Sequence, residues 1–309
     1  MVSLAPRTVV ELFGVDATDG RQPWSAILTD QMCPFTAKRC YKVRKSAPEV
    51  SIGTCTVSFG SPPAPILICP SRLLDRGQIF TDCLHLLTLH EPGNELHLVP
   101  EVKIPGGNVD YFLVSTKDTK VVDFVGIELQ TLDTTGSVWP ERQRVVERLG
   151  VETNDPAVHA KKAFGMNWKM TAKTILVQMH HKASTFEHVN RKLVLVIQNE
   201  FLDYMRGEFK FDHFHEPATI SDTVHLHAYG LKGPVDGHRA LALASRISTD
   251  VAGIGEALDV QAETRVEFET IVAVLESKIS TDTLFSPFNA SVAVHKAAPD
   301  AEVEPDPIA

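Results

Sequence analysis

Hydrophobic and polar positions alternate along the middle of the chain in a way that predicts two adjacent strands. Residues 108–114 (NVDYFLV) and 121–132 (VVDFVGIELQTL) are rich in β-branched and aromatic side chains. The run between them, residues 115–120 (STKDTK), is polar and predicts a turn. We therefore expect a β-hairpin formed by these two segments.

Further along the chain the period of the apolar positions changes to that of helices. Asp155-Pro156 is typical of a helix start, and helical spacing continues to about residue 185 despite Gly165. The remaining segments predict a buried strand at 192–198, a second strand at 223–231, and helices near 239–258 and 265–279. This order of elements predicts a mixed α/β fold.

The chain divides into four parts that differ in composition and in the spacing of their apolar residues. Residues 1–90 contain four clustered cysteines and Pro-rich breaks, so we expect a loop-rich, metal-braced N-terminal region. Residues 91–235 form the α/β core, and residues 236–289 form a helical C-terminal region. The last part, residues 290–309, has one Lys against two Asp and two Glu and predicts a disordered acidic tail.

Composition and charge narrow the class of protein. Hydrophobic residues make up 43% and charged residues 22% of the 309 residues, which is ordinary for a soluble protein. No window approaches the roughly 18 uninterrupted apolar residues of a membrane span, and the start lacks the apolar core of a leader peptide. We therefore expect a cytoplasmic protein without a membrane partner. The net charge of −9 disfavours a wholly basic surface but permits a local basic cleft.

Cys33, Cys40, Cys55 and Cys69 fall close together, with spacings C-x6-C, C-x14-C and C-x13-C. In a reducing compartment such clustering favours a structural metal over disulfides. Four sulfurs at about 2.3 Å from one ion form a tetrahedral site, and loops can supply them at irregular spacing. The alternative is that they are buried free thiols, which is our interpretation of Cys83. His85 and His90 are alternative candidates for one of the four ligand positions.

Strand periodicity sorts the acidic residues of the hairpin. Glu128 and Gln130 share one face with Gly126, and Asp123 points to the other face. Folding back across the polar turn places Asp110 near Gly126, one pair away from Glu128. Because Gly126 has no side chain, it leaves space where two carboxylates could hold a cation. The alternative is a solvated face of surface acids.

Both groups of residues resemble motifs of one enzyme family, the NotI restriction endonucleases, which carry the D…(D/E)-x-K nuclease core with Gln in place of Lys. Residues 126–137 (GIELQTLDTTGS) resemble that family's catalytic strand. The resemblance covers about residues 25 to 140, and no similarity is evident beyond about residue 235. Its metal-binding region is matched by residues 33–35 (CPF), 40–42 (CYK), 51–57 (SIGTCTV) and 69–75 (CPSRLLD).

The resemblance implies a PD-(D/E)xK-like mixed sheet flanked by helices, in a homodimeric type II enzyme. Such an enzyme cuts both strands of double-stranded DNA at a palindromic, GC-rich site. Asp110, Glu128 and the Leu129 carbonyl would bind Mg²⁺, and Gln130 would position the attacking water. The four cysteines, Cys33, Cys40, Cys55 and Cys69, would hold one structural iron per chain. The thiolates alone would suit zinc equally.

Basic residues lie where a nucleic-acid interface would need them. Phosphate contacts or bidentate contacts from Arg to guanine are the functional interpretation, and solvated surface is the alternative. The residues in question are Lys42, Arg44, Lys45, Arg142 and Arg144.

The same residues also fit a second function class, a non-catalytic metal-thiolate protein with a DNA-binding or regulatory role. The common face of Glu128 and Gln130, together with Asp110, favours the enzyme. A binding module has no need of two acids aimed at one point, because they repel phosphate unless a cation intervenes.

Overall fold

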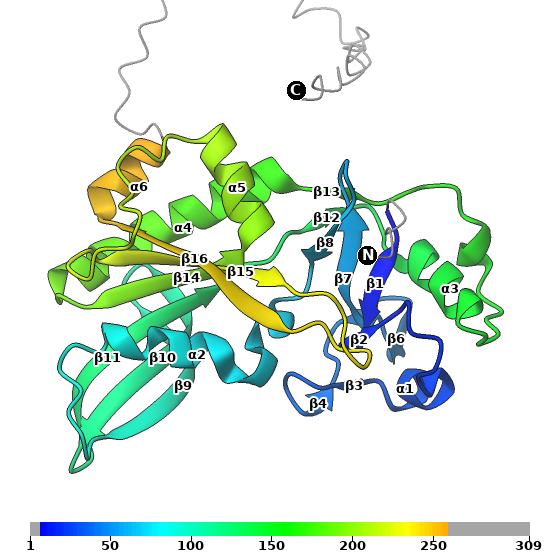
Figure 1. Ribbon diagram of the computed structural model, residues 1–309, viewed down its shortest axis with the longest axis horizontal. Helices are drawn as coiled ribbons and strands as arrows, with labels where there is room; N and C mark the ends of the chain where they lie inside the picture. The colour runs from blue at the N-terminus through cyan, green and yellow to red at the C-terminus, as the bar shows by residue number, and fades with distance from the viewer. Residues whose placement is uncertain (1–6, 259–309) are drawn as a thin grey trace, which may run out of the picture. The chain divides into compact units, whose positions relative to one another are not determined.

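The strand-like segments of the chain form one mixed six-stranded sheet, ordered β16-β15-β14-β11-β10-β9 (Figure 1). The computed structural model describes residues 7–258. In it β9, β10 and β11 form an antiparallel meander, β14 and β15 run parallel to β11, and β16 is antiparallel to β15. The strands are β9 (Glu95–Ile104), β10 (Gly107–Lys117), β11 (Lys120–Leu129), β14 (Lys192–Gln198), β15 (Val224–Leu231) and β16 (Leu241–Thr249).

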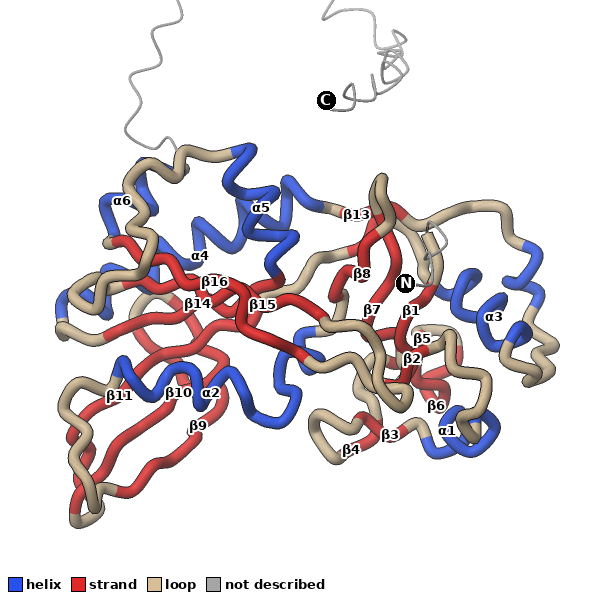
Figure 2. The backbone as a smooth tube through the Cα atoms, viewed as in Figure 1, coloured by secondary structure: helices blue, strands red, loops and turns tan. Residues whose placement is uncertain are grey.

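Helices cover both faces of this sheet, as Figure 2 shows. One face packs against α4 (Trp168–His188), α5 (Asn199–Glu208) and α6 (Val251–Ala257). The opposite face packs against a continuous run of short helices. That run consists of η1 (Pro70–Gly77), α2 (Gln78–Cys83) and η2 (Leu84–Leu86). The central strand β14, KLVLVIQ, is buried along its whole length, as expected for a parallel strand covered on both sides.

A smaller four-stranded sheet, ordered β2-β1-β7-β8, is built from the N-terminal residues. It buries Val9, Leu12 and Val57 and contains an ion pair between Glu11 and Arg72, both fully buried. The expected loop-rich region therefore has more regular structure than its proline content predicts. Its strands are β1 (Val9–Leu12), β2 (Val15–Asp16), β7 (Thr54–Phe59) and β8 (Ala64–Leu67). Beside it lie α1 (Trp24–Asp30) and the hairpins β3 (Met32–Cys33) with β4 (Lys38–Arg39) and β5 (Val43–Arg44) with β6 (Ala47–Ser51).

The predicted hairpin is confirmed, but its turn is shorter than expected. β10 pairs with β11 as far as Lys117 and Lys120, so only Asp118 and Thr119 form the turn. Both have positive φ, 49° and 64°, which suits the right-handed twist of the flanking strands. The polar residues Ser115 and Thr116 belong to β10 and pair with Leu96 and Glu95 of β9. Their hydroxyls hydrogen-bond to His90 and His97.

The predictions for the second half of the chain hold in part. The strands at 192–198 and 223–231 are confirmed as β14 and β15. The helix expected from Asp155 is wrong for residues 155–167, because α4 begins only at Trp168. Residues before it form η3 (Pro156–His159) and β13 (Gly165–Met166), which pairs with β12 (Thr134–Thr135).

The helix expected near 239–258 is also wrong in its first half. Residues 241–249 form β16, which pairs with β15 along its length. The helix α6 starts only after Asp250, whose side chain accepts a hydrogen bond from the Gly253 N–H (2.8 Å). Helix α3 (Trp139–Arg148) was not predicted. The predicted helix at 265–279 and the predicted acidic tail at 290–309 lie outside the described residues. No helix within residues 7–258 is both long and apolar enough to cross a membrane.

Gly126 serves packing rather than cation binding, which corrects the sequence-based interpretation. A Cβ atom placed on Gly126 would lie 2.3 Å from Cζ of Phe186 on α4. The space above this glycine is therefore filled by an aromatic ring, which also stacks on Phe112 with ring centroids 5.9 Å apart.

We therefore expect Gly126→Ala to destabilise the fold by about 1–3 kcal/mol, because the added methyl group would force Phe186 out of its position. Gly207→Ala, in α5 where nothing lies within 4 Å of the added Cβ, is the matched control. It should be neutral or stabilising by up to about 1 kcal/mol. Urea unfolding of the two variants measures both effects, and equal stabilities would contradict the packing role.

Candidate functional site

Two predicted site residues, Asp110 and Glu128, meet where the ladder between β10 and β11 ends. The last pair is Tyr111 with Ile127, so the next position along each strand brings Asp110 level with Glu128. Beyond that pair, the Leu129 N–H donates to Asp110 Oδ2 (2.8 Å). The carboxylates therefore lie on neighbouring strands at the same level.

The predicted register, with Asp110 beside Gly126, is wrong by two residues. Phe112 is the residue paired with Gly126. The turn is centred between Asp118 and Thr119, later than expected, and an irregularity next to Ser115 and Thr116 shifts β11 by one further residue. The correction brings the acids closer to each other than the sequence indicated.

Lys182 of α4 completes this group, and the sequence analysis missed it. Its Nζ lies 2.6 Å from Glu128 Oε1, and both side chains are buried. A signal was present in the sequence: Lys182 occurs on the apolar stripe of α4, between Met179 and Phe186, where a charged residue is unexpected unless it is paired. Its contact with Glu128, however, depends on the packing of α4 across the sheet.

The electrostatics of the pair are those of carboxylates removed from water. Burial raises the pKa of Glu128 to about 7, with the nearby Asp110 charge adding to the rise and Lys182 opposing it. Burial also raises the pKa of Asp110. Apart from the Lys182 ammonium, Glu128 Oε1 has no partner among the described residues although it is buried. Such a pair of acids is stabilised by a cation.

Gln130 follows directly after β11. Its backbone N–H donates to the Val196 carbonyl (3.0 Å), which ties it to β14. Its side-chain Nε2 donates to the Thr131 carbonyl (2.5 Å). This hydrogen bond orients the side-chain amide, and its Oε1 is the side-chain atom that can accept a hydrogen bond from water.

A polar cleft of about 400 Å³ opens beside Asp110 and Leu129. Segments far apart in the sequence form its walls. Tyr41 and Ser71 come from the segments that carry Cys40 and Cys69, and Glu101 comes from β9. Residues next to Cys40 and Cys69 in the sequence therefore border the same cleft as the candidate catalytic carboxylate Asp110.

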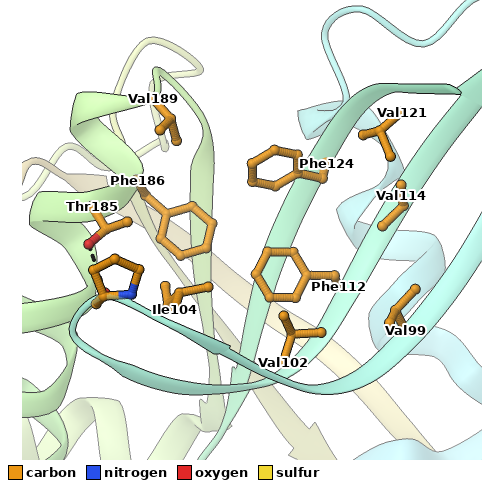
Figure 3. Close-up of a pocket in the computed structure, with 11 residues that line it drawn as sticks. Val99, Val102, Ile104, Phe112, Val114, Val121, Phe124, Thr185, Phe186 and Val189 are labelled. Carbon is orange, nitrogen blue, oxygen red and sulfur yellow. Dashed lines mark hydrogen bonds between the residues drawn. The ribbon is translucent and has the colours of Figure 1, made fainter.

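A second hollow, of about 420 Å³, lies between the end of α4 and the β9–β11 meander (Figure 3). Phe112, Phe124 and Phe186 point toward one another in it, and its walls include no charged side chain. A hollow of this composition contains no group for acid–base or metal chemistry. We therefore place the candidate site at the polar cleft.

The four clustered cysteines are buried and lie close to one another. Burial raises the pKa of Cys40, and the neighbouring Cys69 and Cys33 thiols add to the rise. The pKa of Cys55 is also raised, first by burial and then by Cys69. Cys40 therefore lies near Cys33 and Cys69, and Cys55 lies near Cys69.

Hydrogen bonds tie the segments of this cluster together. Lys42 Nζ donates to the Ile68 carbonyl (2.6 Å), and the Ile68 N–H donates to the Cys55 carbonyl (3.0 Å). The Ser51 hydroxyl donates to the Cys40 carbonyl (2.8 Å). The donor set, four buried thiols on adjacent segments, fits a soft or borderline metal. Within residues 7–258, however, no three His, Cys, Asp or Glu side chains are grouped as they would be around a metal ion.

Most of the predicted basic residues are engaged within the protein. Lys42 binds the Ile68 carbonyl, and Arg44 pairs with Asp155 (2.8 Å). Arg142 is buried over the Trp139 ring, and Arg144 binds Glu141 and two backbone carbonyls. Of the five, Lys45 is exposed and has no partner among the described residues.

Asp123 lies away from the carboxylate pair, as the strand parity predicted, yet it is buried and paired. Its side chain contacts Arg191 Nε (2.9 Å) and accepts from the Leu89 N–H (2.8 Å). We expect Asp123→Asn to lower stability by about 1–3 kcal/mol, because a hydrogen-bonded charge is lost, while the DNA cleavage that the sequence resemblance implies should persist. Thermal unfolding and a cleavage assay measure the two effects. A loss of cleavage as severe as the loss expected in Glu128→Gln would contradict the assignment of the site.

No protein-family model and no curated protein matches this chain. The site is therefore interpreted from its own residues.

Proposed function

We propose that this protein is a Mg²⁺-dependent, sequence-specific DNA endonuclease that acts as a homodimer on a palindromic, GC-rich site. The observation that carries the proposal is the meeting of Asp110 and Glu128 on adjacent strands, with Gln130 after the same strand and Lys182 in contact with Glu128. The order of elements, an antiparallel meander followed by a helix and a parallel strand, supports the PD-(D/E)xK-like fold that the sequence resemblance implies.

Each residue has a distinct role in this proposal. Asp110, Glu128 and the Leu129 carbonyl would hold Mg²⁺, which suits oxygen ligands and retains several waters. The bound ion would lower the pKa of a coordinated water and neutralise charge on the phosphate. Gln130 Oε1 would orient the attacking water by accepting a hydrogen bond from it.

Lys182 supplies the positive charge that the neutral Gln130 lacks. Its Nζ lies 2.6 Å from Glu128 Oε1, and both side chains are buried. In the endonuclease it would stabilise the ionised form of Glu128, opposing the effect of burial. It would also offer a nearby charge to the phosphate that is cleaved.

We propose that the cysteine cluster holds one structural iron, or zinc, per chain through Cys33, Cys40, Cys55 and Cys69. The metal would fix the loops that bring Tyr41 and Ser71 to the cleft. It would have no part in the hydrolysis itself.

The test is incubation of the full-length protein with Mg²⁺ and GC-rich DNA of known sequence, followed by mapping of fragment ends. Discrete fragments with ends at one palindrome, lost in EDTA, are expected. Specific DNA binding without cleavage in Mg²⁺ or Mn²⁺ would instead support a non-catalytic metal-thiolate regulator. Light scattering of the free protein measures whether the chain is a dimer.

A further inference from the structure

Glu101 on β9 is level with the carboxylate pair. Val102 pairs with Val109 and Pro100 pairs with Tyr111, so Glu101 lies opposite Asp110 between these two pairs. Asp110 is in turn level with Glu128. Three carboxylates therefore occupy one row across three adjacent strands.

The backbone at Glu101 departs from that of an ordinary strand. Its φ is 53°, in the left-handed region that residues with a Cβ atom adopt uncommonly, and it is the single such residue in β9. The preceding residue, Pro100, has no N–H to donate. This local distortion interrupts β9 at the level of the site and nowhere else along the strand.

Glu101 shares the polar cleft with Asp110 and Leu129. Its side chain is exposed and has no hydrogen bond or ion pair among the described residues. No lysine or arginine lines the cleft, so its two acids have no basic neighbour on the cleft wall. Glu101 and Asp110 are level with each other on adjacent strands, and like charges in this position repel each other. A cation bound between the acids would relieve this repulsion.

We propose that Glu101 is a further ligand of the divalent cation that Asp110 and Glu128 hold, binding it from the solvent side of the cleft. The inference rests on the proposed metal site and names a third carboxylate for it. Glu128 is compensated from inside the protein by Lys182, whereas Glu101 and Asp110 face solvent. Glu101 would thereby complete the ligand set on the side where the ion enters.

The test is a titration of the full-length protein with Mn²⁺ in the absence of DNA. Binding is measured from the decrease of the electron paramagnetic resonance signal of free Mn²⁺. Wild type should bind one ion at the cleft, and Asp110→Asn should lose it. Glu101→Gln should weaken binding at least about tenfold, since even an outer partner of a metal ligand is worth that much. Glu95→Gln is the matched control, because Glu95 is an exposed acid on the same strand outside the cleft. It should bind like wild type.

Unchanged Mn²⁺ affinity in Glu101→Gln, with binding lost in Asp110→Asn, would overturn this proposal and leave the endonuclease proposal intact. It would mean that Glu101 is a solvated charge that protects the sheet edge. Conversely, Mn²⁺ binding that depends on Glu101 in a protein that cuts no DNA would refute the endonuclease and retain the ligand. A wild type that binds no Mn²⁺ would overturn the role of Glu101.

Discussion

Glu128→Gln and Asp110→Asn should each reduce DNA cleavage by at least about 10²–10³-fold while DNA binding stays as tight or tightens. The reduction follows because each substitution removes a ligand of the ion that activates water and neutralises the phosphate. Binding survives because each substitution also removes a negative charge that repels DNA. Single-turnover cleavage and a gel-shift titration in Ca²⁺ measure the two quantities separately.

The variants must be distinguished from proteins that have merely lost stability. Glu128→Gln leaves the buried Lys182 ammonium without a counter-charge, which costs about 3–5 kcal/mol when a buried pair is broken. The double variant Glu128→Gln/Lys182→Met removes both charges and should recover most of that stability. Its cleavage should remain absent. Cleavage by a folded single or double variant would refute the role of Glu128.

Elements whose signal is local could be predicted from the sequence. The strand β14 is a continuous apolar run, and both of its faces are buried, so its period and its environment agree. The two strands of the hairpin could be predicted because they are rich in β-branched and aromatic residues. The parity of β11 also held, because Phe124 packs toward α4 while Val125 and Ile127 pack toward α2.

Features that depend on pairing partners could not be predicted. Residues 241–249 (LALASRIST) contain good helix formers, yet β15 offers them a free edge, and the ladder decides the structure. Gly165 likewise belongs to a strand because Thr135 lies against it, 2.5 Å from where a Cβ would be. In both segments tertiary contacts outweigh helix propensity.

The candidate site shows the same division. The identities of Asp110, Glu128 and Gln130 came from strand parity and from a resemblance, both of which the sequence contains. Predicting that Asp110 is level with Glu128 would have required knowing the observed position of the turn and the irregularity beside it. Assigning Lys182 to the site depends on the packing of α4, and assigning Glu101 depends on the pairing of β9. Nothing in the sequence relates either residue to Glu128.

The cysteine cluster is expected to contribute to folding rather than to hydrolysis. The sheet of β1, β7 and β8 is anchored in the main core: Leu12 and Val57 belong to the apolar cluster that includes α4, and Leu67 belongs to the cluster that includes α2. The short hairpins that follow Cys33 and Cys40 have few buried apolar residues of their own. A metal held by the cluster would therefore fix mainly these hairpins, not the whole N-terminal region.

Cys55→Ser should give protein with about one transition metal fewer per chain and with increased amide hydrogen exchange over residues 31–53, because a tetrahedral thiolate site loses its ion with a ligand. Cys83→Ser is the matched control. Cys83 is also buried but is the last residue of α2, where its Sγ is 3.8 Å from His227 Nδ1, so metal content and cleavage should be retained. Elemental analysis of the purified proteins decides between the outcomes. A stable, active and metal-free wild type would exclude the metal site. Zinc in place of iron would refute only the identity of the metal that the resemblance implies, because four thiolates accept either ion.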